Sequence, residues 1–346
     1  MISQAIAQIL DGRSLSTEEA EHVMDEIMGG QATPAQIAGF LIALRAKGET
    51  VDEITGCARA MRRAATRVEP SSPDLIDTCG TGGDGAGTFN ISTVTAFVVA
   101  GAGLRVAKHG NRSVSSRSGS ADVLKALGVN LELTPDQVAT CIDKVGIGFL
   151  FAPRLHPAMK HAIGPRRELG VRTIFNILGP LTNPANAQVQ LLGVYDPALT
   201  EVLAQVLQEL GSRAAYVVHG HDGLDELTTT GPNRISRFGV GDHADEVITE
   251  TLDPRDLGLG LASQDDLRGG EPEENAQITR AILSGTDQGP RRDVVLLNAG
   301  AALLVGGRAS TLAEGIAKVA ESIDSGSALR RLDALIALSR RFAAAA

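Results

Sequence analysis

Two glycine-rich, hydroxyl-rich segments of this 346-residue chain have the composition of anion-binding loops. The first runs from Gly80 to Thr88 and the second from Lys108 to Ser116. Each follows a short apolar run that predicts a strand and precedes an alanine- and valine-rich stretch that predicts a helix. Glycines allow backbone N–H groups to converge on an anion, and the N-terminus of the following helix adds partial positive charge. Two such loops, the second with Lys108 and Arg112, indicate a ligand with more than one phosphate group.

Hydroxyl and acidic side chains near the first loop suit the same ligand. Ser92 and Thr93 come where the helical pattern begins, so each hydroxyl could cap the helix, contact a phosphate or bind a cation held by that phosphate. For Thr93 alone we prefer capping, whereas the adjoining glycines favour ligand binding by Ser92. Asp84 would repel an anion, and we expect it to accept hydrogen bonds from ribose hydroxyls or from loop N–H groups.

The second loop supplies positive charge. Lys108 directly follows a strand-like run, and ligands of open α/β sheets gather at the carboxyl edge of the strands. A solvated surface charge is the alternative for Lys108 and Arg112, but their glycine and serine neighbours favour ligand contact. His109 is interpreted as a structural or positioning residue, because nothing in the sequence supplies an orienting partner for its ring.

A pair of carboxylates, Asp225-Glu226, follows another predicted strand. Oxygen ligands of this kind suit Mg²⁺, which commonly accompanies a polyphosphate ligand. Acidic pairs also occur on ordinary solvated turns, so the two anion loops are what favours a metal site here. His219 and His221 lie nearby, but no third His or Cys close in sequence completes a site for a softer metal.

Other ligand classes fit the sequence poorly. The P-loop pattern G-x-x-x-x-G-K-[ST] is absent, which argues against an ATPase of that class. The chain has 32 basic and 41 acidic residues and no Trp, which argues against a nucleic-acid binder. We therefore expect small-molecule substrates and no nucleic acid.

The termini, apolar runs and cysteines indicate a cytoplasmic protein with no membrane partner. The N-terminus lacks a basic leader, and no apolar stretch reaches the ~18 residues that a membrane-spanning helix needs. Cys57, Cys79 and Cys141 form no CxxC pair and are interpreted as reduced thiols. Cys79 adjoins the first loop, but no histidine close in sequence would activate it as a nucleophile.

Helices with clear caps are predicted over the first 65 or so residues. Ser16–Glu19 and Thr50–Glu53 are capping boxes, in which a hydroxyl and a carboxylate satisfy unpaired N–H groups reciprocally. Thr33 is an N-cap before a proline at the first helical position. These signals predict a small helical unit.

From about Leu75 the pattern changes to short β-branched runs that alternate with helical stretches, which predicts an α/β domain with a largely parallel sheet. The predicted strands are Leu75–Cys79, Leu104–Ala107, Phe149–Phe151, Val189–Val194 and Ala214–Val218. After Asp225 the pattern is less regular, and no strand is predicted there. The predicted helices are Thr93–Gly101, Ala121–Leu127, Pro135–Lys144, Ala198–Leu210, Ile278–Leu283, Arg292–Leu304, Leu312–Ser322 and Ala328–Phe342.

A basic, proline-rich segment, residues 153–184, interrupts the alternation. We interpret it as linking or inserted structure that packs back on the N-terminal helices. A ligand cleft would then lie between the helical unit and the sheet domain. We expect a helical domain over residues 1–70, to which segment 153–184 could be joined, and an α/β domain over residues 71–346.

Seven motifs resemble, in order, those of the anthranilate phosphoribosyltransferase family of tryptophan biosynthesis. They span most of the chain, so the resemblance is specific. They are Gly80–Asp84, Asn90–Thr93, Lys108–Arg112, Ser118–Asp122, His156–Lys160, Arg172–Asn176 and Asp222–Glu226.

The resemblance implies a fold and an activity. The fold is a helical N-terminal domain beside an α/β domain like that of nucleoside phosphorylases, with a largely parallel sheet flanked by helices. The molecule would be a homodimer through the helical domains. The enzyme would be a Mg²⁺-dependent glycosyltransferase of the pentosyltransferase class. It would move the 5-phosphoribosyl group from phosphoribosyl pyrophosphate to the amine of anthranilate, giving N-(5-phosphoribosyl)anthranilate and pyrophosphate.

The resemblance also implies roles for residues. Gly80, Asn111 and Arg166 would bind anthranilate, with Arg166 pairing with its carboxylate. Ser92, Asp225 and Glu226 would hold Mg²⁺. Residues of both loops and of the segments after them would bind phosphoribosyl pyrophosphate: Gly80, Gly83, Asp84, Thr88, Asn90, Ile91, Ser92, Thr93, Lys108, His109, Gly110, Asn111, Arg112, Ser113, Val114, Ser115, Ser116 and Ser120.

The implied reaction needs charge stabilisation more than proton transfer. Negative charge grows on the pyrophosphate as its bond to the ribose stretches, and Mg²⁺, Lys108 and loop N–H groups would stabilise that charge. The anthranilate amine is a neutral nucleophile, so no strong base is required and catalysis would be mostly positioning.

Two alternatives remain at the level of sequence. A nucleoside phosphorylase would share the fold but use inorganic phosphate, and it would not need the pair Asp225-Glu226. A non-enzymatic nucleic-acid-binding relative would need a basic groove, which the acidic balance of the chain does not favour.

Overall fold

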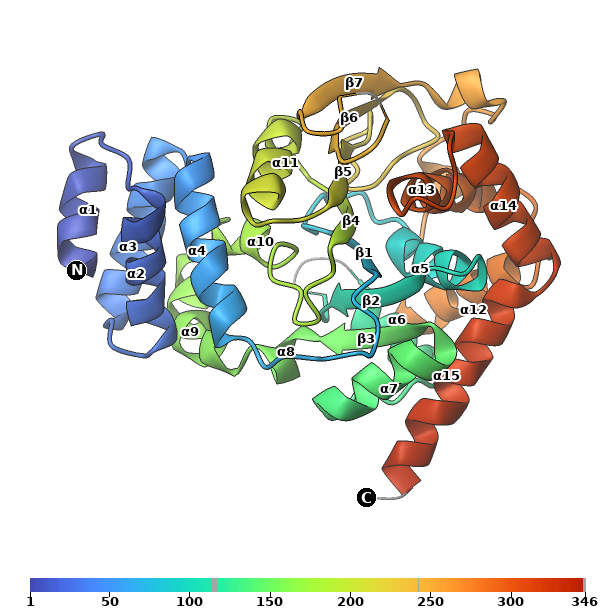
Figure 1. Cartoon of the computed structure of the whole chain (residues 1–346), viewed down its shortest axis with the longest axis horizontal. Coiled ribbons are helices and arrows are strands. Elements are labelled where there is room, and N and C mark those ends of the chain that lie inside the picture. The colour runs from blue at the N-terminus through green and yellow to red at the C-terminus, as the bar shows by residue number, and fades with distance from the viewer. Residues whose placement is uncertain (114–116, 242, 345–346) are drawn as a thin grey trace.

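The computed structural model describes residues 1–113, 117–241 and 243–344. A bundle of helices lies beside a seven-stranded sheet that has helices on both faces (Figure 1). The bundle is at the N-terminal end of the chain, and the last helix ends on the opposite side of the sheet domain. Within the described residues, no helix is both long enough and apolar enough to cross a membrane.

The N-terminal bundle contains four helices, and the last three start at the predicted caps. The four are α1 (Ile2–Leu10), α2 (Thr17–Met28), α3 (Pro34–Lys47) and α4 (Val51–Ala64). The Ser16, Thr33 and Thr50 hydroxyls each accept a hydrogen bond from the backbone N–H three residues later, and the side chain at that position accepts one in return. The capping boxes predicted at Ser16 and Thr50 are confirmed.

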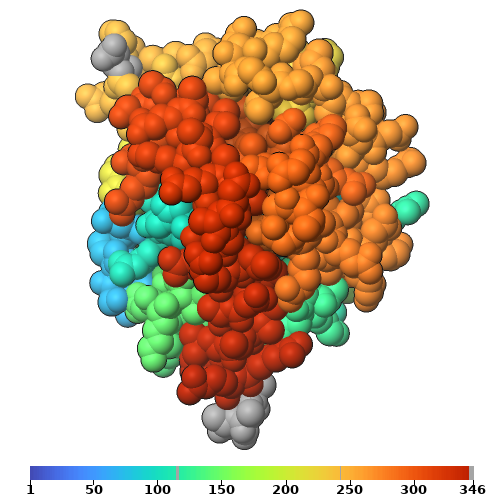
Figure 2. All heavy atoms as spheres, turned by 90° about the vertical axis from the view of Figure 1, so that its right-hand side faces the viewer, coloured from blue at the N-terminus to red at the C-terminus, as the bar shows by residue number. Residues whose placement is uncertain are grey.

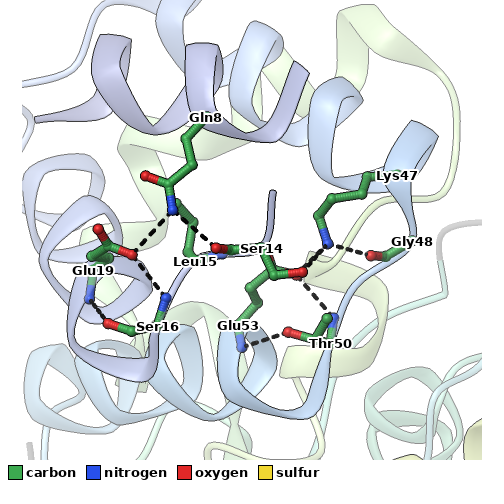
Figure 3. Close-up of polar contacts among 9 residues, drawn as sticks. All are labelled: Gln8, Ser14, Leu15, Ser16, Glu19, Lys47, Gly48, Thr50 and Glu53. Carbon is green, nitrogen blue, oxygen red and sulfur yellow. Dashed lines mark hydrogen bonds and ion pairs between the residues drawn. The ribbon is translucent and has the colours of Figure 1, made fainter. Parts of the chain in front are cut away.

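Glu53 has a second role inside the bundle, because its carboxylate lies fully buried between two loops (Figure 3). It accepts hydrogen bonds from the N–H groups of Leu15 (3.0 Å) and Thr50 (2.9 Å), and it pairs with the Lys47 ammonium at 2.9 Å. Lys47 Nζ also contacts Ser14 Oγ at 3.2 Å. A buried carboxylate is tolerated only with such partners. Glu53 therefore holds the loop after α1 against the loop before α4.

The sheet has the strand order β3-β2-β1-β4-β5-β6-β7. The strands are β1 (Leu75–Gly80), β2 (Arg105–Gly110), β3 (Ile147–Phe151), β4 (Val189–Gly193), β5 (Ala214–His219), β6 (Asn233–Phe238) and β7 (Ile248–Leu252). The first five pair in parallel, as predicted, and β6 and β7 are added antiparallel. The last two strands were not predicted. Both contain several polar or charged residues, and β7 is partly exposed, so neither gives the continuous apolar run of a buried strand.

The second strand also extends further than its apolar run. Its predicted end was Ala107, but Lys108, His109 and Gly110 continue the ladder opposite Phe149, Leu150 and Phe151. Polar residues are tolerated in this buried strand because their side chains find partners in the site described below. The prediction that Lys108 and His109 belong to a loop is wrong, although they do lie at the carboxyl end of the strand.

Helices cover both faces of the sheet. Helices α5 (Ile91–Gly101), α13 (Pro290–Val305), α14 (Leu312–Asp324) and α15 (Ser327–Ala344) lie on one side, where the C-terminal part of the chain forms most of the visible surface (Figure 2). The same side includes α6 (Ser120–Leu127), α7 (Pro135–Val145) and α12 (Pro272–Leu283). The other side is covered by α11 (Leu199–Glu209), which packs against α4 of the bundle.

The proline-rich segment forms short helices between β3 and β4. They are α8 (Ala152–Leu155), a 3₁₀ turn (Pro157–Met159), α9 (Lys160–Leu169) and α10 (Phe175–Leu178). Helix α9 packs against α2 and α3 of the bundle, and α10 packs against α4. Arg62 of α4 donates hydrogen bonds to the Leu181 carbonyl (2.7 Å) and the Leu210 carbonyl (3.2 Å), and burial lowers its pKa to about 10. This segment is thus in contact with the bundle as well as the sheet.

Candidate active site

The first glycine loop leaves β1 at its carboxyl end and lies beside the turn after β5. Gly82 and Gly83 have φ of +70° and +76°, a conformation that glycine adopts without strain. Among the described residues, the N–H groups of Gly83, Asp84, Gly85 and Gly87 form no hydrogen bond. Neighbouring backbone N–H groups without partners form a concave anion site.

Two glycines allow the turn after β5 to approach this loop closely. A Cβ atom on Gly80 would collide with the Asp225 carboxylate, and one on Gly193 would collide with the Asp225 carbonyl. Gly82 N–H donates to Asp225 Oδ2 at 2.6 Å, and Ser92 N–H donates to Glu226 Oε1 at 3.1 Å. The structure therefore brings the two predicted magnesium carboxylates against the first loop and the start of α5.

The three acidic side chains here repel one another. Burial, followed by the neighbouring charges of Asp84 and Glu226, raises the pKa of Asp225 well above its usual range. Burial also raises the pKa of Glu226, and Lys108 is the largest influence against that rise. Asp84 Oδ1 accepts from the Ala86 N–H at 3.2 Å, so it stiffens the loop as one of the two predicted alternatives requires. A cation would relieve this crowding.

The donor set fits a hard divalent cation that keeps ligands other than protein. Asp225 and Glu226 supply carboxylate oxygens, and Ser92 supplies a hydroxyl at the start of α5. In the described part of the chain, no three His, Cys, Asp or Glu side chains are grouped closely enough to hold a metal by themselves. Mg²⁺ usually takes one or two carboxylates and completes its shell with water and substrate phosphates. The residues present fit that ion.

The predicted cations and hydroxyls differ in how far they are buried. Lys108 is buried, and its ammonium donates to the Thr78 carbonyl and to Ser92 Oγ (3.3 Å). Helix α5 begins after Asn90, whose side chain does not cap it but bonds the Ser118 carbonyl (3.0 Å) and Asn275 Nδ2 (2.9 Å). Ile91 and Thr93 are buried, and Thr93 Oγ1 has no partner among the described residues. Thr93 therefore does not act as the helix cap.

The second loop is held by the start of α6. The Asn111 carbonyl accepts from Ser120 Oγ and the Ala121 N–H, each at 3.2 Å. Ser113 N–H donates to Asp122 Oδ2 at 3.1 Å. The Arg112 guanidinium lies 5.7 Å from the ring centre of Phe151. Gly110 is the last residue of β2, Thr88 forms an isolated bridge with Arg268, and the predicted residues Val114, Ser115 and Ser116 lie outside the described residues.

His109 has the orienting partner that the sequence did not reveal. Its Nε2 lies 3.2 Å from Nε2 of His156, and both rings are buried. Its backbone N–H donates to Asp77 Oδ1 at 3.1 Å, while Asp77 Oδ2 accepts from Asn183 Nδ2 at 2.7 Å. The pair links the end of β2 to the segment that carries α9, which supports a positioning role for His109.

Arg166 is a desolvated cation on the same segment, residues 153–184, as His156. It lies on α9, and its guanidinium is 5.0 Å from the ring centre of Phe175. Burial lowers its pKa, and among the described residues no acidic side chain forms an ion pair with it. An arginine in this state is suited to bind a carboxylate in bidentate fashion.

Arg172 and Asn298 lie at the site but were not among the residues predicted for it. Arg172 was quoted in a family motif but given no role, and its guanidinium lies over the ring of Tyr195 with a hydrogen bond to the Gly83 carbonyl. Asn298 of α13 is buried and holds both the N–H and the carbonyl of Leu227, next to the acidic pair. The only signal for Asn298 was an amide in the middle of an apolar helix.

Comparison with known families gives the class of protein first. Residues 3–65 match the helical bundle domain of a glycosyl transferase family, and residues 72–329 match the α/β domain of the same family. The order of bundle and sheet in this structure agrees with that assignment.

Relatives and solved structures then narrow the class. The anthranilate phosphoribosyltransferase of Moorella thermoacetica is 59% identical over 344 residues, which is 99% of this chain and 100% of that protein. The crystal structure of anthranilate phosphoribosyltransferase from Thermus thermophilus has a TM-score of 0.92 and 45% identity, covering 97% of this chain and 99% of that chain. The yeast enzyme, solved in complex with phosphoribosyl pyrophosphate and Mg, has a TM-score of 0.88 and 31% identity over 98% of each chain. This chain belongs to the anthranilate phosphoribosyltransferase family, which confirms the resemblance seen in its motifs.

Proposed function

We propose that this protein transfers the 5-phosphoribosyl group from phosphoribosyl pyrophosphate to the amine of anthranilate, with release of pyrophosphate, in a Mg²⁺-dependent step of tryptophan biosynthesis. One juxtaposition carries the proposal. The first loop, with its unpartnered N–H groups, lies between Gly82 and Ser92, which donate hydrogen bonds to the carboxylates of Asp225 and Glu226 at the carboxyl edge of the parallel strands. Anion site and cation site therefore occupy one place, as a metal-bound polyphosphate requires.

The donor would bind with its pyrophosphate in the first loop. The N–H groups of Gly83, Asp84, Gly85 and Gly87 would hold its oxygens, and the start of α5 would add partial positive charge. Bound Mg²⁺ would neutralise charge that develops on the leaving pyrophosphate. Lys108 would keep Ser92 Oγ in place through their 3.3 Å contact. These groups are already oriented, so little reorganisation is needed as the bond breaks.

The acceptor would bind on the side of α9. Arg166 would pair with the anthranilate carboxylate, and Gly80 and Asn111 at the ends of β1 and β2 would contact the ring and amine. A neutral aromatic amine can attack before it loses its proton, so the site needs orientation more than a strong base. His109 and His156 would serve orientation, since burial lowers the pKa of each, to about 3 and about 4.

Pyrophosphate release is the test of this function. The protein is incubated with phosphoribosyl pyrophosphate and Mg²⁺, with and without anthranilate, and parallel samples contain a nucleoside with inorganic phosphate. Release that needs both anthranilate and Mg²⁺ supports the proposal. Pyrophosphate release at the same rate with and without anthranilate would rule out anthranilate as the acceptor. Base liberation from the nucleoside would favour a phosphorylase instead.

We also propose a homodimer that forms through the helical domain, in a cytoplasmic protein. Leu10, Ile42 and Ile163 are exposed apolar residues on α1, α3 and α9, and burial in a dimer would remove them from water. The three cysteines are buried and free, in keeping with a reducing compartment. Light scattering of the wild type and of Ile42→Glu tests the dimer, and a monomeric wild type would exclude it. Cell fractionation tests the location.

The same proposal includes the domain division. Residues 1–70 would form the helical domain, joined by segment 153–184, and the rest of residues 71–346 would form the α/β domain. The packing of α9 on α2 and α3 supports that grouping. Limited proteolysis should cut near residue 70 before it cuts within either unit.

A further inference from the structure

The motif Arg172–Asn176 contains a side chain that reaches the donor loop. The Arg172 guanidinium lies 4.0 Å from the ring centre of Tyr195 and donates a hydrogen bond to the carbonyl oxygen of Gly83. Arg172 is half-buried, and Tyr195 follows the end of β4. A planar guanidinium stacked on a ring has few rotamers left to lose, so its hydrogen bond can fix a backbone group at low entropic cost.

The rest of the loop is held at its two ends by other elements. Thr81 is bound to the end of β4 through the Gly193 carbonyl (2.9 Å) and the Tyr195 N–H (3.1 Å). Gly87 accepts a hydrogen bond from the Gly269 N–H at 3.0 Å. Among the described side chains, Arg172 is the only one that donates a hydrogen bond to the Gly83 carbonyl. It is therefore placed to set the orientation of the middle of the loop.

The orientation of that carbonyl determines where the next N–H points. In a planar trans peptide the C=O and the N–H point in opposite directions. When Arg172 holds the Gly83 carbonyl, the Asp84 N–H is turned the other way, and it has no partner among the described residues. Loss of Arg172 would free this peptide to rotate and to present its carbonyl to an incoming anion. Arg172 thus favours the anion-binding form of the loop.

The same short segment also carries the acceptor side. Arg172 follows Arg166 by six positions, just beyond the end of α9 at Leu169. The Thr173 N–H donates to Asn176 Oδ1 at 3.0 Å, which fixes the start of α10, and Phe175 of α10 lies against the Arg166 guanidinium. Movement of Arg172 would therefore shift the surroundings of Arg166, and movement of Arg166 would shift those of Arg172.

We propose that Arg172 is a positioning residue that holds the donor loop and couples occupation of the donor site to affinity at the acceptor site. The inference rests on the proposed function, because it takes Arg166 as the acceptor contact. Coupling between two sites is reciprocal and is typically 5–150-fold in affinity. In this protein, most of the change in anthranilate affinity on binding at the donor site would depend on Arg172.

The experiment measures anthranilate binding by its fluorescence, with and without Mg²⁺ and pyrophosphate as a non-reacting occupant of the donor site. For the wild type we expect the anthranilate Kd to change at least about fivefold when pyrophosphate and Mg²⁺ are present. For Arg172→Gln we expect a ratio near one and a KM for phosphoribosyl pyrophosphate about tenfold higher. Arg172→Lys keeps the charge but loses the stacked planar fork, and we expect it to restore only part of the ratio.

Arg167→Gln is the matched control, because Arg167 is an exposed arginine near the end of α9, five positions before Arg172 and outside these contacts. It should keep the wild-type ratio of anthranilate Kd values and the wild-type KM for phosphoribosyl pyrophosphate. This result would show that the position of Arg172 matters, and not merely the loss of one positive charge. Tyr195→Leu keeps Arg172 but removes its ring, and it should lower the ratio as well, so the proposal stays testable if Arg172→Gln does not fold. A wild-type ratio of one, or a folded Arg172→Gln with the wild-type ratio, would overturn the inference. Absence of anthranilate-dependent pyrophosphate release in the wild type would instead defeat the proposed function.

Discussion

At the scale of single residues, the structure keeps a crowded pair of carboxylates apart from an arginine that has no acidic partner among the described residues. Asp225 and Glu226 crowd together with raised pKa values, whereas Arg166 is desolvated with no acidic partner among the described residues. Such unmatched charges are costly in a free protein and are expected where charged ligands will complete them. Two predictions follow from this separation.

Replacement of Arg166 should affect one substrate only. We expect Arg166→Gln to raise the KM for anthranilate about 10–100-fold, because a charge-assisted hydrogen bond contributes about 1.5–3 kcal/mol. The KM for phosphoribosyl pyrophosphate should change less than about threefold, which initial-rate measurements with each substrate varied will show. Arg167→Gln, on the exposed side of the helix, is the control. Equal effects on both substrates would contradict the assigned role.

Replacement of the acidic pair should change stability and metal response in opposite directions. Because the folded protein raises the pKa of Asp225 and Glu226, their ionised forms cost stability, and this cost grows as the pH rises from the usual carboxylate range through the raised values. We expect Asp225→Asn with Glu226→Gln to raise Tm in the presence of a chelator. The same variant should need at least about tenfold more Mg²⁺ for half-maximal rate. If the variant and the wild type needed the same Mg²⁺ concentration for half-maximal rate, these residues would not be metal ligands.

At the scale of elements, helix α13 holds the turn that carries the acidic pair. Asn298 is fully buried, and its amide accepts from the Leu227 N–H (3.0 Å) and donates to the Leu227 carbonyl (2.7 Å). On the other side of the turn, Asp222 accepts from the hydroxyls of Thr228 (3.2 Å) and Thr230 (2.9 Å). The position of the carboxylates therefore depends on a helix about 70 residues away in sequence.

Asn298→Ala should destabilise the fold by about 2–6 kcal/mol, because two buried backbone groups lose their partner at about 1–3 kcal/mol each. Chemical denaturation gives this free energy of unfolding. The exposed Gln277 of α12 offers a matched amide control, for which we expect less than about 0.5 kcal/mol. If the free energy of unfolding changed as little as in the Gln277 control, the hydrogen bonds from Asn298 to Leu227 would not be needed for stability.

Local signals explain which elements could be predicted. The capping boxes at Ser16 and Thr50 and the apolar strands β1, β4 and β5 depend on residues that are neighbours in sequence, and the structure has them where expected. Strands β6 and β7 lie at the exposed side of the sheet, and their pairing comes from contact with β5 rather than from an apolar run. The continuation of β2 through Lys108 likewise depends on pairing with β3.

At the scale of the whole molecule, the buried histidine pair makes stability depend on pH. Burial lowers the pKa of His109 to about 3, with His156 as the next influence, and burial lowers that of His156 to about 4. Both values lie below the ordinary 6.5, so the unfolded chain binds more protons than the folded one between these limits. The stabilisation is complete above about pH 6.5 and is lost as the pH falls toward 4.

We expect the free energy of unfolding to fall by about 3 kcal/mol through His156 alone between pH 6.5 and 4, since each unit of pKa corresponds to 1.36 kcal/mol. Urea denaturation at several pH values measures this slope. His156→Gln should flatten it, whereas His22→Gln, at an exposed position of α2, should not. An equal slope in the His156 variant would contradict the assignment.

The candidate site shows the same limit of sequence reasoning at molecular scale. The carboxylate pair and the glycine loop were predictable, because each is a run of adjacent residues with its own chemistry. His156, the partner of His109, is 47 residues away in sequence. Tyr195, whose ring stacks on Arg172, follows the end of β4. Contacts of this kind depend on how segment 153–184 packs between bundle and sheet. The sequence indicated that this segment packs on the bundle, but not which side chains would meet.

The most direct test of the central claim is a crystal structure with phosphoribosyl pyrophosphate and Mg²⁺ bound. The account predicts the pyrophosphate within hydrogen-bond distance of the N–H groups of Gly83, Asp84, Gly85 and Gly87, between that loop and the end of β2, with the metal next to Asp225 or Glu226. Donor density elsewhere on the molecule, with both of these loops empty, would contradict it.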